Sequence, residues 1–256
     1  MQGRVGITGS VKDVEKNGCC FVFAVDMDGG GHLHGGRFDD VAIYTKRYPQ
    51  AGWGMALPEF CRSGVTVINR ATGGRSSMSF ISEKRWEGIL RAGKSGDFVI
   101  IQFGHNDAEY GEKNIYRTTY PETTFPLYLK IYIAEARRRG MIPVLCTQTA
   151  VHRFNDKGRA FNTPKAETYI AACRQVAAET GCDFVDLNAA ALVAMNEMGR
   201  SAARENHLIL PEGKYPNFPD GINDNVHLSS KGAKFYAELF VKEAKRQKLP
   251  VAGLFL

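Results

Sequence analysis

The chain has 256 residues, of which 44% are apolar and 11% aromatic, so it can bury one sizeable core and we expect a single domain. Its formal charge is +6, but Lys and Arg are spread through segments of helical pattern, which favours solvated helix surfaces over a nucleic-acid-binding face. No stretch predicts a membrane span and no signal peptide is recognisable, so we expect a soluble protein of undetermined compartment and oligomeric state.

The first forty residues differ in pattern from the remainder. They are rich in Gly and lack a clean period, so we separate residues 1–40, which include the first strand region, from a single domain at residues 41–256. Two short apolar runs, at residues 5–8 and 21–25, are each consistent with the first strand, and the sequence leaves this choice open.

The cysteines and the N-terminal histidines give no metal or disulfide signal. No two of the six cysteines form a Cys-x-x-Cys pair, and several lie in apolar patterns as small hydrophobic residues do. His32 and His34 lie in a Gly-rich stretch without a third ligand nearby in the sequence, which favours a surface segment over a metal site. We therefore expect no metal and no cofactor.

From residue 48 onward, the pattern alternates between strands and helices. Apolar runs rich in β-branched residues predict strands at residues 65–69, 97–102, 142–147 and 184–187. Helical spacing predicts helices at residues 53–60, 80–92, 125–140, 164–181, 189–198 and 229–244, with a polar loop at residues 108–124. This alternation predicts βαβ units around a parallel sheet, an α/β fold.

The strand at residues 97–102 ends in the sequence Phe-Gly-His-Asn-Asp, in which Asn106 is the fourth residue. An apolar run of this length between two glycines is typical of a strand buried on both faces in a parallel sheet. Residues just past the carboxyl end of such a strand face the crevice in which ligands bind. Asn106 is therefore expected at a binding crevice, and a helix N-cap is the alternative interpretation.

A second polar motif is Asp224-Asn225-Val226-His227, directly before Ser229 and the last predicted helix. An Asp three residues before a His, on a loop entering a helix, can fold back so that its carboxylate meets a ring nitrogen of the His. That contact fixes the tautomer of the ring and stabilises the imidazolium that forms when the His acts as a base. A loop with a cap is the plainer interpretation of this motif alone, and the pairing with Asn106 favours a catalytic one.

Four blocks of the sequence resemble the SGNH (GDSL-type) hydrolases, in particular their rhamnogalacturonan acetylesterase branch. In chain order they are Tyr-Pro-Gln-Ala-Gly-Trp-Gly at residues 48–54, Asn-Arg-Ala-Thr-Gly-Gly-Arg-Ser-Ser at residues 69–77, and the motifs of Asn106 and Asp224. The resemblance implies a three-layer α/β/α sandwich with a central parallel sheet, of flavodoxin-like type. It also implies ester hydrolysis without a metal or organic cofactor.

The resemblance assigns a role to each matching residue. His227 would be the general base and Asp224 its orienting carboxylate. Gly74, through its backbone N–H, and Asn106, through its side-chain amide, would donate to the oxyanion of a tetrahedral intermediate. A Gly at position 74 also allows a positive φ, although a plain turn is the alternative.

Two further residues of these blocks have open or supporting interpretations. We interpret His105 as a hydrogen-bonding residue behind the site. Arg75 either binds an acidic sugar or pairs with a structural carboxylate, and the sequence leaves both alternatives open.

The sequence lacks the Gly-Asp-Ser block that carries the nucleophile in this family. The corresponding interval, residues 36–42, contains Asp39 and Asp40 but no Ser, and the only Ser among the first 62 residues is Ser10. Three hypotheses follow: Ser10 is a displaced nucleophile, an Asp occupies the site, or the N-terminal segment is a frame-shifted reading of the gene. The Asp hypothesis gives an impaired enzyme, because a carboxylate attacking an ester forms an anhydride rather than an ordinary acyl-enzyme.

Two functions from different classes remain. The first is a carbohydrate O-acetylesterase that acts on an acetylated polysaccharide or oligosaccharide, such as pectic rhamnogalacturonan, with Ser10, Asp224 and His227 as its triad. The second is a catalytically impaired carbohydrate-binding protein that keeps the cleft but lacks the nucleophile. A lipid or thioester hydrolase is a more distant alternative, because the loops at residues 108–124 and 152–163 are polar and suit a sugar better than an acyl chain.

Overall fold

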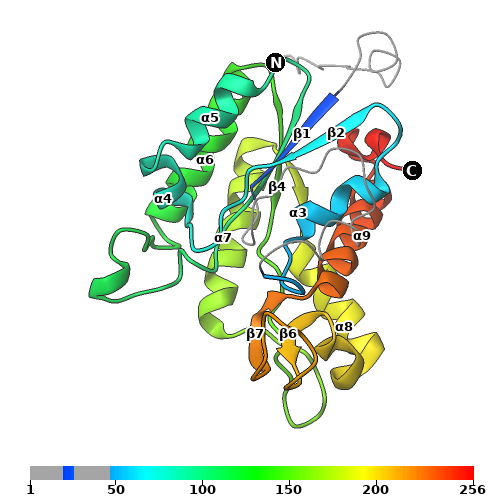
Figure 1. Ribbon diagram of the computed structural model, residues 1–256. Coiled ribbons are helices and arrows are strands. Elements are labelled where there is room, and N and C mark those ends of the chain that lie inside the picture. Colours follow the sequence, from blue (N-terminus) through cyan, green and yellow to red (C-terminus); the bar gives the residue numbers. More distant parts are fainter. Residues whose placement is uncertain (1–19, 26–46) are drawn as a thin grey trace.

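A computed structural model describes residues 20–25 and 47–256 of the chain (Figure 1). Its central sheet has the strand order β2-β1-β3-β4-β5, and all four strand pairs are parallel, as predicted. The strands are β1 (Cys20–Val25), β2 (Val65–Asn69), β3 (Phe98–Gln102), β4 (Ile142–Cys146) and β5 (Asp183–Val185). This is the flavodoxin-like order, in which ligands bind outside the carboxyl ends of β1 and β3.

The structure shows which of the two short apolar runs, residues 5–8 or 21–25, forms the strand next to β2 and β3. Residues 20–25 form β1, an interior strand of the sheet between β2 and β3, whereas residues 5–8 lie outside the described residues. The sheet therefore takes a strand from residues 1–40, and the boundary at residue 41 stays a prediction.

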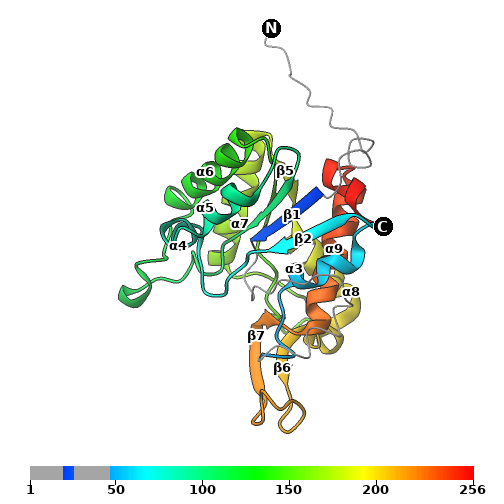
Figure 2. The same cartoon turned by 45° about the horizontal axis from the view of Figure 1, so that its top comes forward.

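Helices cover both faces of the sheet (Figures 1 and 2). One face carries α4 (Ser77–Ser82), α5 (Arg85–Ala92), α6 (Thr124–Arg138) and α7 (Pro164–Thr180), and the other carries α3 (Trp53–Ala56), α8 (Leu187–Arg204) and α9 (Ser230–Arg246). Short 3-10 helices are η1 (Leu57–Phe60), η2 (Glu112–Asn114) and η3 (Pro250–Leu254). Successive residues of β3 alternate between the two cores: Phe98 and Ile100 pack on the side of α9, and Val99 and Ile101 on the side of α6. The predicted α/β/α sandwich is confirmed.

A buried polar contact supports the carboxyl ends of the central strands. Trp53 is fully buried, its indole N–H donates to Oε1 of Gln102 at 2.9 Å, and its ring packs against Phe240. The amide of Gln102 in turn donates to the carbonyl of Thr147 at 2.7 Å. The Gly-Trp-Gly block thus braces the ends of β3 and β4 directly below the crevice.

The helix predicted at residues 80–92 is in fact two helices. Lys84 adopts the left-handed conformation, with φ 59°, and separates α4 from α5. After this break, Trp86 packs edge-on against Tyr132 with ring centroids 4.8 Å apart, and its indole N–H donates to Glu135. Tertiary packing therefore overrides a continuous helical pattern.

The end of the β5 region also differs from the prediction. The strand covers residues 183–185 instead of 184–187, and Leu187 is already the first residue of α8. Asp186 caps this helix by accepting a hydrogen bond from the backbone N–H of Ala189.

An antiparallel hairpin of β6 (His207–Leu210) and β7 (Ile222–Leu228) was not predicted, and it corrects the placement of the Asp224 motif, which lies on β7 and not on a loop. Leu228 pairs with His207, and Asp224 with Leu208, so residues 225–227 bulge from the ladder. β7 is mostly polar and interrupted by the bulge, and β6 has only four residues, which hides both from a periodicity argument. The hairpin lies below the central sheet in Figure 1.

Candidate active site

The bulge on β7 brings Asp224 and His227 together. Oδ2 of Asp224 lies 2.6 Å from Nδ1 of His227, and Oδ1 accepts the backbone N–H groups of Val226 at 2.9 Å and His227 at 3.0 Å. The hydrogen-bond distance predicted for this pair is therefore confirmed. Every hydrogen-bond partner of the carboxylate therefore comes from the next three residues.

The contact with Asp224 fixes the tautomer of the His227 ring. Burial raises the pKa of Asp224, but hydrogen bonds from the backbone of His227 and Val226 and from the His227 ring outweigh it and lower the pKa overall. A charged Asp224 accepts a hydrogen bond from Nδ1–H, which leaves the lone pair of the neutral ring on Nε2. The His227 side chain is 40% exposed, so a reacting group can approach it.

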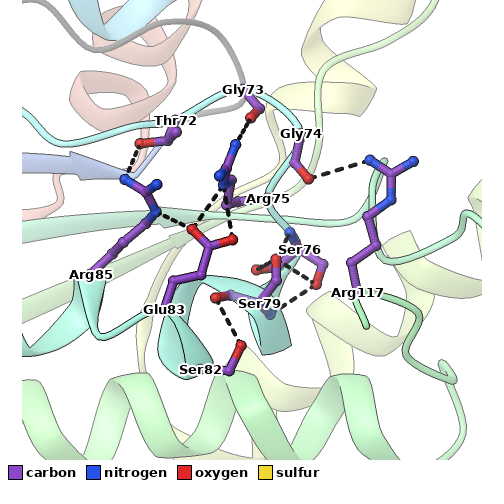
Figure 3. A network of polar contacts seen from close by, with 10 residues as sticks. All are labelled: Thr72, Gly73, Gly74, Arg75, Ser76, Ser79, Ser82, Glu83, Arg85 and Arg117. Carbon is purple, nitrogen blue, oxygen red and sulfur yellow. Dashed lines mark hydrogen bonds and ion pairs between the residues drawn. The ribbon is translucent and has the colours of Figure 1, made fainter. Parts of the chain in front are cut away.

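Gly74 lies in the turn between β2 and α4, with φ 80°, as expected of a backbone that needs a Gly. The turn is held at its end by Ser76, which caps α4 by accepting from the backbone N–H of Ser79, while the Ser79 hydroxyl accepts from the backbone of Ser76. The backbone around Gly74 is therefore fixed from the helix side (Figure 3).

Asn106 and Gly74 are joined by Arg117, which the sequence analysis missed. Nη1 of Arg117 donates to Oδ1 of Asn106 at 2.9 Å and to the carbonyl of Gly74 at 3.3 Å. The other guanidinium nitrogens donate to Oδ1 of Asn114 at 3.1 and 2.8 Å. Because Arg117 holds the amide oxygen of Asn106, the amide N–H groups face away from the guanidinium. No sequence signal identified Arg117, since it lies in an irregular polar loop.

Asp107 anchors the two loops that carry Gly74 and Asn106. Its buried carboxylate accepts from the hydroxyls of Ser77 at 2.5 Å and Thr119 at 2.8 Å, and from the backbone N–H groups of Ser77 at 3.1 Å and Gly104 at 3.2 Å. Burial raises the pKa of Asp107 to about 6, even though these hydrogen bonds lower it. The position next to Asn106 within its block was the one available signal for this residue.

His105 links the loop after β3 to the loop after β4. Its Nε2–H donates to the carbonyl of Thr149 at 3.0 Å, in agreement with the expected supporting role, and burial lowers the pKa of the ring to about 4. His227 is close enough to contribute to this lowering. In the loop after β4, the backbone N–H of His152 donates to the carbonyl of Asn225 in the bulge at 2.8 Å.

Arg75 pairs with a structural carboxylate, the second of its two alternatives. Its Nε donates to both oxygens of Glu83, at 3.2 and 3.0 Å, and its Nη1 donates to the carbonyl of Gly73 (Figure 3). Burial raises the pKa of Glu83, but hydrogen bonds from Arg85 and Arg75 lower it overall.

The proposed nucleophiles, Ser10, Asp39 and Asp40, lie outside the described residues. The end of β1 nevertheless shows which part of the sequence would be expected to carry the nucleophile. Val25 pairs with Ile101 of β3, so the residues after it in the chain are the ones that follow the carboxyl end of a central strand. Residues 26–43 contain no Ser, Thr or Cys, and Ser10 precedes β1 in the chain.

The described part of the chain shows neither a membrane-spanning helix nor a metal-binding cluster. None of its helices is both long enough and apolar enough to cross a membrane. Residues 20–25 and 47–256 also hold no cluster of three or more His, Cys, Asp or Glu side chains arranged to bind a metal ion.

The fold and this arrangement of side chains define an SGNH-type acyl hydrolase scaffold, and the chain belongs to the GDSL-like lipase/acylhydrolase family, whose model matches residues 35–235. It is 34% identical over 203 residues to the rhamnogalacturonan acetylesterase RhgT of Bacillus subtilis, covering 79% of this chain and 84% of that protein. It is also 35% identical over 220 residues to the probable rhamnogalacturonan acetylesterase YesY of the same organism, covering 86% and 95%. The family match contains Asp39 and Asp40 but not Ser10.

Two solved structures share the fold. The YxiM protein of Bacillus subtilis superimposes with a TM-score of 0.69 at 22% identity, over 91% of this chain and 58% of that one. A mutant of Axe2, an acetyl-xylooligosaccharide esterase of Geobacillus stearothermophilus, superimposes with a TM-score of 0.59 at 20% identity, over 89% and 94%.

Proposed function

We propose that the protein is a carbohydrate O-acetylesterase that removes acetyl groups from a pectic polysaccharide such as rhamnogalacturonan. The observation that carries this proposal is the 2.6 Å contact between Oδ2 of Asp224 and Nδ1 of His227, which leaves Nε2 of the ring to face a reacting group. The family membership and the relatives named as rhamnogalacturonan acetylesterases support the reaction and the substrate class.

In the proposed reaction, Nε2 of His227 takes the proton of the nucleophile as its oxygen attacks the acetyl carbonyl. Asp224 stabilises the imidazolium, and negative charge develops on the carbonyl oxygen. The N–H of Gly74 and the amide of Asn106 donate to that oxygen, while the sugar hydroxyl leaves with the proton from His227. His227 then takes a proton from water, which attacks the acyl-enzyme and releases acetate and the free nucleophile.

Ser10 is the nucleophile in this proposal, as the only Ser among the first 62 residues. The second candidate function, a carbohydrate-binding protein without a nucleophile, is favoured by one observation. The interval after β1 that the family match enters, up to residue 43, contains no hydroxyl or thiol side chain of Ser, Thr or Cys.

The deciding experiment compares hydrolysis of p-nitrophenyl acetate by the parent chain and three variants. Ser10→Ala and His227→Ala should both abolish activity, whereas Ser63→Ala, a matched change at an exposed position of the described chain, should leave it unchanged. Full activity in Ser10→Ala would exclude Ser10 as the nucleophile. An inactive parent would favour the binding protein or the frame shift, and a reading frame of the coding DNA that encodes Gly-Asp-Ser would then identify the latter.

The substrate class needs its own measurement. Acetate release from acetylated rhamnogalacturonan should exceed release from acetylated xylan at equal acetyl concentration. A preference for xylan would keep the esterase reaction but contradict the pectic substrate.

A further inference from the structure

A cleft of about 180 Å³ opens beside the His105 side of the site. Its walls come from the loop after β3, the loop after β4 and the first turn of α7. The side chains that line it include His105, Glu109, Gln148, Arg153, Phe161 and Lys165. Because His105 lines the cleft and directly precedes Asn106, a chain of sugars with its acetyl group at Asn106 has neighbouring units within reach of this cleft.

Two cations line the cleft without a carboxylate partner. Neither Arg153 nor Lys165 forms an ion pair with any of the described residues, and each instead lies over an aromatic ring. The guanidinium of Arg153 is 6.0 Å from the centroid of Phe161, and Nζ of Lys165 is 4.1 Å from that of Tyr110. Among the described residues that line the cleft, Glu109 carries the one carboxylate, so the positive side chains of Arg153 and Lys165 outnumber the negative one.

A buried acceptor also lines the cleft. The side chain of Gln148 is 5% exposed, and its Oε1 has no hydrogen-bond partner among the described residues. A Cβ at Gly104 would lie only 2.0 Å from this oxygen, so Gly104 leaves the space that it occupies. An unpaired buried oxygen costs free energy, and a ligand hydroxyl that donates to it removes that cost.

Exposed aromatic rings continue from the cleft along the protruding loop before α6. Phe161 is 39%, Tyr110 46% and Tyr120 56% exposed, and the rings of Tyr110 and Tyr120 are stacked with centroids 5.9 Å apart. Exposed aromatic faces of this kind mark binding surfaces, and sugar rings present apolar C–H faces that can pack on them. The loop projects to the left in Figure 1.

We propose that this cleft binds a uronate unit of the polysaccharide next to the acetylated sugar, an inference that rests on the proposed function. Arg153 and Lys165 receive the carboxylate, Phe161 packs against the sugar ring, and Oε1 of Gln148 accepts a hydrogen bond from a ring hydroxyl. The cleft thereby selects acidic polysaccharides over neutral ones with the same acetyl ester.

The test is a calorimetric titration of the full chain with trigalacturonate and, separately, with neutral xylotriose. The parent should bind trigalacturonate at least roughly tenfold more tightly than xylotriose, and the double variant Arg153→Gln/Lys165→Gln should lose roughly tenfold or more of that affinity. Arg139→Gln removes an exposed cation just past α6, at the amino end of β4, whereas the cleft lies past the carboxyl end of that strand, and this change should leave binding unchanged. Added salt should weaken binding of trigalacturonate alone.

Equal affinity for the two trisaccharides would overturn the proposal, as would a double variant that is folded by circular dichroism and binds as the parent does. Gln148→Met provides a second variant of similar volume, which should weaken binding of trigalacturonate without changing the salt dependence. The titration measures binding and needs no nucleophile, so it tests the uronate-binding cleft independently of the esterase reaction. A chain that binds trigalacturonate but hydrolyses no ester contradicts the esterase, whereas an active esterase without a preference for uronates contradicts this cleft.

Discussion

Arg117 is the residue whose substitution tests the geometry of the site most directly. Replacing it with Met keeps most of the side-chain length but removes the hydrogen bonds to Asn106, Gly74 and Asn114. The amide of Asn106 then loses the donor that fixes its oxygen, which weakens the preference for presenting N–H groups to the developing oxyanion. Arg117 acts only through the two donors, so we expect kcat to fall while KM changes little.

The size of the effect follows from the bonds lost. A hydrogen bond to a charged group is worth about 1.5–3 kcal/mol, which corresponds to a roughly 10- to 150-fold fall in kcat. Direct removal of an oxyanion donor costs about 100- to 1,000-fold, so Asn106→Ala should be the more severe variant. The assay is initial-rate hydrolysis of p-nitrophenyl acetate at several concentrations, with Arg139→Met as the matched control.

A double-mutant cycle decides whether Arg117 works through Asn106. In the Asn106→Ala background, Arg117→Met should have a much smaller effect on kcat than in the parent, because the amide that it orients is already absent. Equal fold-changes in the two backgrounds would refute this reasoning, and a change confined to KM would reassign Arg117 to substrate binding.

Three further predictions concern the residues around the site. Asp224→Asn should lower kcat by about 10,000-fold with the fold intact, because the ring of His227 loses the acceptor that fixes its tautomer, and a loss below tenfold would argue against the pair. Asp107→Asn should lower the free energy of unfolding by about 3 kcal/mol in urea titrations, since an amide nitrogen then faces donors that need an acceptor, whereas Thr119→Val should cost only about 1 kcal/mol. His105 has a pKa of about 4 in the folded chain against 6.5 unfolded, so the unfolded state binds more protons between these values and stability falls as pH falls through that window, by at most about 3 kcal/mol. His105→Gln should lose less stability over the same window, and because the raised pKa of Asp107 acts in the opposite sense in both proteins, the difference between them isolates His105.

The strands and helices that sequence patterns predicted best have local signals. The helix α7 begins with Thr163 as its cap and Pro164 in its first turn, and it ends at Gly181 in the left-handed conformation, all within the segment itself. The break at Lys84 and the hairpin of β6 and β7 have no such signal, because each depends on what the segment packs or pairs with. The choice of β1 likewise needed the neighbouring strands β2 and β3, since both candidate runs are short and apolar.

The residues of the candidate site also divide into those with a local sequence signal and those without one. Asp224 and His227 are three residues apart, and a contact of that range is visible in a sequence motif. Arg117 lies eleven residues from Asn106 and forty-three from Gly74, in a loop without periodicity, so only the fold reveals that it joins them. The cleft beside His105 is hidden for the same reason, because its two cations come from different segments.

The bulge on β7 brings both members of the proposed acid–base pair, Asp224 and His227, from one short segment. The hydrogen-bond donors to the Asp224 carboxylate all lie within four consecutive residues, while β6 and the loop after β4 hold the bulge itself, through the pairing of Leu208 and the backbone N–H of His152. The proposed oxyanion donors have the opposite character, since two loops supply them and Arg117, further along the loop of Asn106, holds the two together. Substitutions in the loop of Arg117 should therefore disturb the proposed oxyanion donors while leaving the contact between Asp224 and His227 in place.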